Sequence, residues 1–172
     1  MKSIHALKLT AATASGVERI FSQAAAPWLN RSATGGVEGV WRVKDLADSC
    51  LGREAPEVIV ADEQGLRAEL ARLASLEPRV VGIELSGNEY LQVGLGGPWA
   101  FVEHVVDEPW KAEVALPRVG AGPKPESVWF VCSGQGSEIP ARYLLPTAEA
   151  LEAVVECLRL GGASPAWEWE LV

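Results

Sequence analysis

The sequence is poor in the side chains that most often carry catalysis and metal binding. It has two histidines and three cysteines in 172 residues. No cysteine lies at helical or knuckle spacing from another metal ligand, so no metal site is predicted. There is no Walker A sequence, and no Gly-x-Gly pair stands between a clear strand and a helix, as a dinucleotide site requires. We therefore expect no cofactor and no enzymatic activity.

The three cysteines, Cys50, Cys132 and Cys157, are far apart and odd in number. They do not indicate a disulfide framework, so a reducing compartment and a cytoplasmic location are predicted. No apolar run approaches the roughly 18 residues of a membrane span. A cysteine-dependent hydrolase, with Cys132 as nucleophile and His104 as base, stays an alternative. A packed core cysteine is favoured because no lysine or arginine lies near Cys132 in the sequence to lower its pKa.

Basic residues are also scarce, since 15 Lys and Arg stand against 23 Asp and Glu, a net charge of −8. Residues 1–50 hold six basic and four acidic groups, which leaves 9 basic and 19 acidic groups for the remaining 122 residues. Such a surface repels phosphate backbones and anionic membranes and attracts basic partners. Nucleic acid and membrane are therefore not expected as partners, although acidity also serves solubility alone.

Apolar periodicity predicts an α+β fold, an antiparallel-rich sheet (meander) with helices packed mainly on one face. Residues 1–36 form an N-terminal extension with a helix around 17–29, and residues 37–172 form a single domain. One helix follows Asp62 as N-cap, and the other opens at Pro146 and ends at Gly161. Their apolar stripes are formed by Leu66, Leu70 and Leu73 and by Leu151, Val154, Val155 and Leu158.

Three strands, VVGIEL, EYLQVGL and PWAFVEHVV, follow each other closely and predict a meander. Alternation places Ile83 opposite Val93 and Leu85 opposite Leu91, through a three-residue loop at 87–89. The same logic pairs Val93 with Phe101. The second face of this meander then displays a half-polar set that could meet a partner: Glu84, Ser86, Tyr90 and Gln92.

The other elements are predicted from shorter patterns. A strand is expected around 40–43, a short helix at 46–51 and a buried strand at 58–60. Prolines in 107–126 predict a long irregular connection. SVWFVCS, residues 127–133, is apolar on both faces and is typical of a central strand. AWEWELV, residues 166–172, alternates strictly and predicts a final strand.

The C-terminal two thirds resembles family one of the bacterial immunity proteins. A Tyr-Leu-x-Val-Gly strand is matched by Tyr90, Leu91, Val93 and Gly94. A closing Gly-x-x-Pro followed by Trp is matched by Gly162, Pro165 and Trp169, with Trp167 in a place more often held by an aliphatic residue. The resemblance covers roughly residues 58–172 and implies an α+β fold with a C-terminal tryptophan.

Members of that family accompany polymorphic toxins, typically ones with deaminase domains. The resemblance therefore implies an immunity protein that neutralises a cognate bacterial toxin by tight binding and occlusion of its active site, with no catalysis. The toxin is expected to be basic, and the protein to act as a monomer or weak homodimer. The alternatives are a non-catalytic regulatory or scaffold binding module and the small cysteine-dependent hydrolase.

The closing Trp-Glu-Trp-Glu segment contributes the last candidate residues. On a strand, Trp167 and Trp169 point to one side and Glu168 and Glu170 to the other. The tryptophans are expected to be structural and the carboxylates to face a partner. The predicted partner-binding set is therefore Glu84, Tyr90, Gln92, Glu168 and Glu170.

Overall fold

The structure, a computed structural model, describes residues 40–47, 55–107, 109–118 and 123–172. Its strands are β1 (Trp41–Asp45), β2 (Glu57–Val60), β3 (Arg79–Ser86), β4 (Glu89–Leu95), β5 (Trp99–Val106), β6 (Lys111–Ala115), β7 (Ser127–Cys132), β8 (Gln135–Pro140), β9 (Leu145–Pro146) and β10 (Trp169–Leu171). Its helices are α2 (Glu63–Ala74), the 3-10 helix η1 (Ala141–Tyr143) and α3 (Thr147–Leu160). The predicted extension 1–36, and most of the helix predicted at 46–51, lie outside the described residues.

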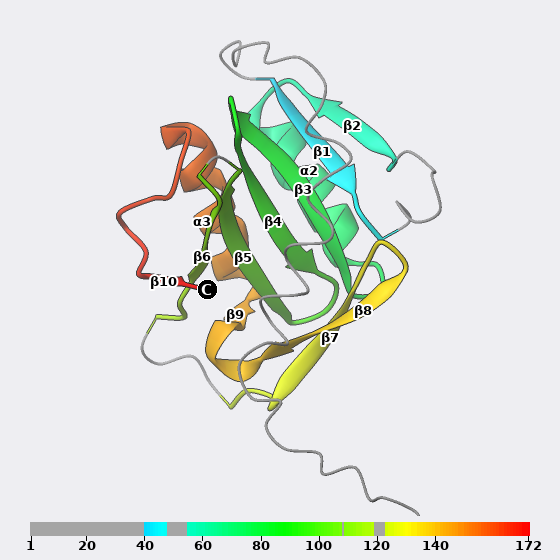
Figure 1. The fold of residues 1–172 in the computed structure, drawn as a ribbon. Helices are drawn as coiled ribbons and strands as arrows, with labels where there is room; N and C mark the ends of the chain where they lie inside the picture. Colours follow the sequence, from blue (N-terminus) through cyan, green and yellow to red (C-terminus); the bar gives the residue numbers. More distant parts are fainter. Residues whose placement is uncertain (1–39, 48–54, 108, 119–122) are drawn as a thin grey trace, which may run out of the picture.

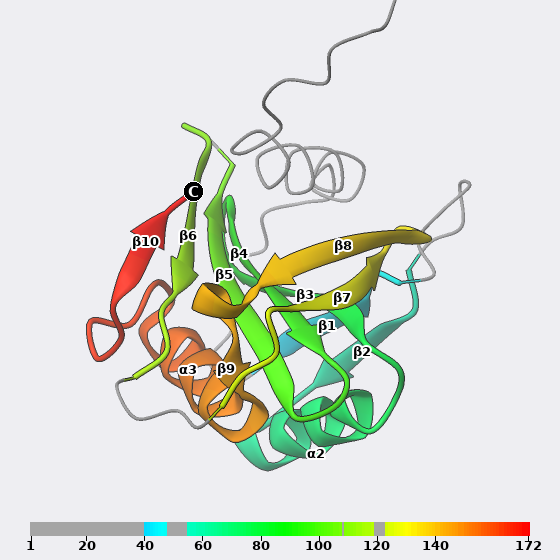
Figure 2. The ribbon, with the colours of Figure 1, turned by 90° about the horizontal axis from the view of Figure 1, so that it is seen from below.

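Two helices lie on one face of the sheet, and a two-stranded hairpin crosses the other face (Figures 1 and 2). Seven strands follow the order β10-β6-β5-β4-β3-β1-β2. Neighbours along this path are antiparallel, and β3, β4 and β5 form the expected meander. The β7–β8 hairpin joins the path through one parallel bridge between Arg79 and Val131. The predicted α+β class and meander are confirmed.

Both predicted helices are present with their predicted ends. Asp62 caps α2, because its carboxylate accepts a hydrogen bond from the Gly65 N–H at 2.7 Å. The stripe Leu66, Leu70 and Leu73 is buried against the sheet. Gly161 ends α3 with a φ of 69°, a left-handed conformation that glycine adopts without strain. The helices are therefore fixed by local signals that the sequence displays.

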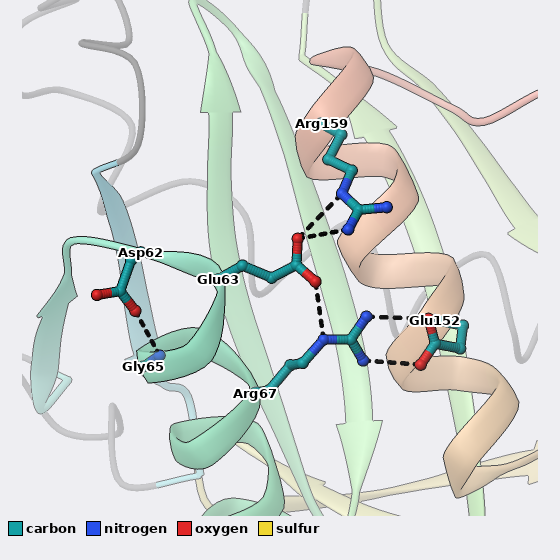
Figure 3. A network of polar contacts seen from close by, with 6 residues as sticks. All are labelled: Asp62, Glu63, Gly65, Arg67, Glu152 and Arg159. Carbon is teal, nitrogen blue, oxygen red and sulfur yellow. Dashed lines mark hydrogen bonds and ion pairs between the residues drawn. The ribbon is translucent and has the colours of Figure 1, made fainter.

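Charged side chains bridge the outer surfaces of α2 and α3 (Figure 3). Arg67 makes a two-pronged contact with Glu152 at 2.7 and 3.0 Å, and Arg159 reaches Glu63 at 2.6 Å. Hydrogen bonds from these arginines hold the pKa of both carboxyls below the usual range. Exposed ion pairs stabilise a fold only slightly, so the buried leucine and valine stripes hold the helices to the sheet. The network nevertheless neutralises Glu63 and Glu152.

The register between β3 and β4 differs from the prediction by two residues. Ile83 pairs with Leu91 and Val81 with Val93, and a bulge leaves Leu85 between two paired positions. The connecting turn holds two residues, 87–88, and the bulge compensates for it, so that the apolar residues of both strands still share the helix-facing side. Alternation assigned the faces correctly but not the pairing.

The pairing predicted between β4 and β5 is wrong by one residue. Val93 pairs with Val102, and Phe101 pairs with Gly94 and faces the hairpin. β5 is apolar on both sides, because Val102 contacts the helix-side core and Phe101 the hairpin-side core. Alternation carries no register information in such a strand.

Two strands predicted to be buried are partly exposed. β2 lies at the edge of the sheet and pairs only with β1, which leaves Ile59 61% exposed. β7 is not a central strand, because it forms a ladder with β8 alone. Its inward residues Phe130 and Cys132 are buried, whereas its outward Trp129 is 59% exposed. An apolar pattern on both faces was therefore a wrong guide to burial in both strands.

The segment 107–126 contains a strand that its prolines concealed. β6 pairs with β5 on one side and with β10 on the other. Its outer partner β10 is shorter than predicted, because the strand begins at Trp169 and Trp167 lies in the preceding turn. The connection between β5 and β7 therefore contains β6, which pairs with the C-terminal strand β10.

Candidate partner-binding surface

The predicted partner-binding residues do not form one surface. Glu84 is on β3 and Glu170 is on β10, with three strands between them. At the usual inter-strand spacing the two strands lie roughly 19 Å apart. Glu84 is also compensated, since Lys44 Nζ lies 2.9 Å and Arg42 Nε 3.8 Å from its carboxylate.

Tyr90 and Gln92 lie on the expected sheet face, but they are only 1% and 2% exposed. Glu103 pairs with Gln92 across the β4–β5 ladder and is fully buried. Within the described part of the chain, Gln92 Nε2 and both Glu103 carboxylate oxygens lack hydrogen-bond partners. Burial holds the pKa of Glu103 well above its usual range. This part of the sheet face is interior, so Tyr90 and Gln92 do not present a partner-facing surface.

The two C-terminal carboxylates have different surroundings. Glu168 is exposed, and its backbone carbonyl accepts a hydrogen bond from the Leu116 N–H at 2.8 Å. Glu170 accepts a hydrogen bond from the Tyr143 hydroxyl at 2.8 Å and lies 3.9 Å from Arg142. Of the five predicted residues, Glu168 is therefore the one whose carboxylate is exposed and outside the ion pairs and hydrogen bonds described here.

The two C-terminal tryptophans are tied into the fold. Trp167 is 5% exposed, and its indole N–H donates to Glu156 Oε2 at 2.7 Å. The Trp169 indole N–H donates to the Ser164 carbonyl at 2.8 Å. The Ser164 hydroxyl donates to Glu156 and accepts a hydrogen bond from the Ala166 N–H. The Gly-x-x-Pro-to-Trp cue therefore corresponds to a set of hydrogen bonds that joins the end of α3 to β10. We call the four residues that form it, Glu156, Ser164, Trp167 and Trp169, the clamp.

The Tyr-Leu-x-Val-Gly cue lies in the middle of the sheet on β4. Leu91 and Val93 belong to the core beneath the helices. Gly94 is required by close packing, because a Cβ there would lie 2.3 Å from the ring of Phe101 and 3.0 Å from that of Phe130. This cue also marks a structural feature rather than a binding site.

The outer face of the β7–β8 hairpin combines exposed apolar and acidic side chains. Trp129 is 59% and Val131 40% exposed, on the side opposite the buried Phe130. Glu138 pairs with Trp129 across the ladder and is exposed. The sequence signal for this surface is the strand's second apolar face, a pattern that also predicts burial. We define the hairpin outer face as Trp129, Val131 and Glu138.

Cys132 and His104 do not form a catalytic pair. Cys132 packs with Phe101 on the hairpin side of the sheet, and burial raises the pKa of its thiol. His104 pairs with Leu91 of the helix-side core, and its ring meets Trp169 edge-on with centroids 6.3 Å apart. His104 Nε2 lies 2.9 Å from Glu89. Within the described ranges, no group of three or more His, Cys, Asp and Glu is arranged to hold a metal ion.

Comparison with known families decides the identity. A family model described as immunity protein Imm1 matches residues 54–171. The chain belongs to the Imm1 family of immunity proteins. The match runs from just before β2 to the end of β10, so it includes both motifs, the clamp and the hairpin. Comparison with curated proteins yields no match.

Membership of the Imm1 family fixes the broad role of the protein. An immunity protein acts against a toxin, which implies a cognate toxin as partner and points to a binding role. In the part of the chain that the structure describes, no helix is long and apolar enough to cross a membrane.

Proposed function

We propose that this Imm1 protein neutralises a deaminase-type toxin by binding tightly and occluding its active site. The observation that carries the proposal is the Imm1 match across nearly the whole described fold. The deaminase specificity rests on the sequence resemblance and on charge. The protein acts in the cytoplasm, as a monomer or weak homodimer.

The net charge of −8 supports a basic partner. Enzymes that act on nucleic acid carry basic surfaces, and an acidic inhibitor is steered to such a surface and competes with phosphate for it. Several acidic groups of the fold are already neutralised, among them Glu63, Glu84 and Glu152. Among the described residues, the exposed carboxylates without an ion pair, such as Glu138 and Glu168, are the ones available to a toxin.

The experiment is co-expression with the toxin encoded by the adjacent gene. We expect cells that express the toxin to survive only with this protein, and the two chains to co-purify as a stoichiometric complex. In the purified system, cytosine or adenine deamination of a nucleic-acid substrate should stop at one equivalent of the protein. Cell death despite expression of the protein would refute the immunity role. Neutralisation of a toxin without deaminase activity would refute only the deaminase specificity.

A further inference from the structure

We propose that the hairpin outer face is the surface that docks the toxin, with Trp129 as its central anchor. The inference rests on the proposed function, because it assumes that the protein binds a toxin. The occupant is a basic surface of the toxin with an apolar pocket for the indole. Three features of the hairpin support this assignment.

The first feature is apolar exposure that folding does not require. The inward side chains of β7 already supply the core contacts, since Phe130 meets Phe101 edge-on with ring centroids 5.2 Å apart. The outward positions could therefore be polar without loss to the core. They hold instead Trp129 and Val131, which lie two residues apart on one side of the strand. Adjacent exposed apolar side chains with an aromatic centre are typical of interface hot spots.

The second feature is rigidity. Trp129 lies across Gly136, where a Cβ would come within 3.0 Å of the indole. The hairpin turn is anchored by the Ser133 N–H, which donates to the Leu46 carbonyl at 2.7 Å, and by a second such bond from Gly134 to Ala47. An indole held on an anchored hairpin loses little conformational freedom on binding, which favours affinity.

The third feature is uncompensated charge. Glu138 stands directly across from Trp129, and Glu126 lies just before β7. Glu138 accepts a hydrogen bond from the neutral Ser127 hydroxyl. Neither acid forms an ion pair with a Lys or Arg among the described residues, in contrast to Glu63, Glu84 and Glu152. Lys124, two residues before Glu126, donates to the Leu144 carbonyl at 2.6 Å, and Arg142, four residues after Glu138, lies 3.9 Å from Glu170. The hairpin outer face is therefore apolar and negative, which matches a basic toxin surface.

The other strand with adjacent exposed apolar residues, β2, lacks this combination. The edge strand β2 exposes Val58 and Ile59, but its Glu57 is paired with Arg42 at 2.7 Å and Lys44 at 3.4 Å. Its charge is balanced, so it offers no complementarity to a basic partner. This contrast favours the hairpin.

The test uses the full-length protein and the toxin domain of the adjacent gene, inactivated at its catalytic residue. Dissociation constants are measured by surface plasmon resonance for the wild type, Trp129→Ala, Glu138→Lys, Glu168→Lys and Trp110→Ala. Trp110 is a matched control, because it is a 45% exposed tryptophan in the connection between β5 and β6, outside the hairpin. Circular dichroism and thermal unfolding verify the fold of each variant.

We expect Trp129→Ala to weaken binding about 30-fold or more, mainly through faster dissociation. Glu138→Lys should slow association about tenfold at low salt, and this effect should shrink as ionic strength rises. Trp110→Ala should stay within about twofold of the wild type. Should Trp129→Ala fail to fold, hydrogen exchange on the wild-type complex gives the same decision, with protection expected at residues 127–140.

Binding of Trp129→Ala and Glu138→Lys within threefold of the wild type, or absence of protection at 127–140, would overturn the inference. A loss confined to Glu168→Lys would overturn it in favour of the C-terminal acids. If the wild type itself neither binds nor neutralises the toxin, the proposed function fails as well. If the wild type neutralises the toxin and the hairpin variants bind it as tightly as the wild type does, the proposed function stands and this inference alone is wrong.

Discussion

Replacing Trp167 tests whether the C-terminal tryptophans hold the fold together. Trp167 is 5% exposed in the core beneath the helices, so Trp167→Ala removes a buried aromatic ring. Such truncations cost about 3–5 kcal/mol in free energy of unfolding. In a domain of this size, that corresponds to a fall in melting temperature of roughly 6–20 °C.

Two conservative variants separate the indole N–H from the ring. Trp167→Phe removes a hydrogen bond to the Glu156 carboxylate, which should cost about 1.5–3 kcal/mol because the acceptor is charged. Trp169→Phe removes a hydrogen bond to the neutral Ser164 carbonyl and should cost about 1 kcal/mol. The expected order of destabilisation is Trp167→Ala, then Trp167→Phe, then Trp169→Phe.

The assay is urea unfolding followed by circular dichroism, with toxin affinity measured on each folded variant. Affinity should follow the folded fraction alone, because the clamp is structural. A Trp167→Ala protein within 0.5 kcal/mol of the wild type would refute the clamp. So would a stable Trp167→Phe protein with weakened toxin binding, because the indole would then contact the partner.

Three further predictions concern the sheet. Gly94→Ala should lower the free energy of unfolding by about 1–3 kcal/mol in the same urea assay, because the new methyl group collides with Phe101; an unchanged midpoint would contradict this packing. Burial raises the pKa of Glu103 in the folded state above its unfolded value of about 4.3. Above that pH the folded state therefore holds a proton that the unfolded state has lost. The contribution of Glu103 to the free energy of unfolding consequently falls as pH rises. Glu103→Gln should therefore raise the melting temperature at pH 8 and flatten its dependence on pH, and equal slopes for both proteins would oppose the assignment. Burial and a raised pKa should make Cys132 of the native protein alkylate far more slowly than in urea, as peptide mass spectrometry would show; fast native labelling would revive the hydrolase alternative.

The helices and the meander could be predicted because their signals are local. The Asp62 cap, the leucine stripe and the Gly161 stop each depend on residues within a few positions of one another. The faces of β3 and β4 followed from alternation for the same reason. Their pairing did not, because a bulge at Leu85 changes the register without changing the pattern.

The candidate site could be predicted only in part, because exposure is decided by distant segments. Tyr90 and Gln92 alternate like solvent-facing residues yet are buried. Trp129 lies in a strand that is apolar on both sides, a pattern shared by buried strands and by interface strands. Only the finding that β7 forms a ladder with β8 and meets β3 at a single bridge separates the two interpretations.

Neutralisation by binding is tested most directly by a titration of the purified toxin's activity with this protein. We predict that activity falls linearly and reaches zero at one equivalent, with Trp129→Ala shifting the curve to a shallow, incomplete inhibition and Trp110→Ala leaving it unchanged. Full toxin activity at a tenfold excess of the folded wild-type protein would contradict the claim that it neutralises this toxin by binding it.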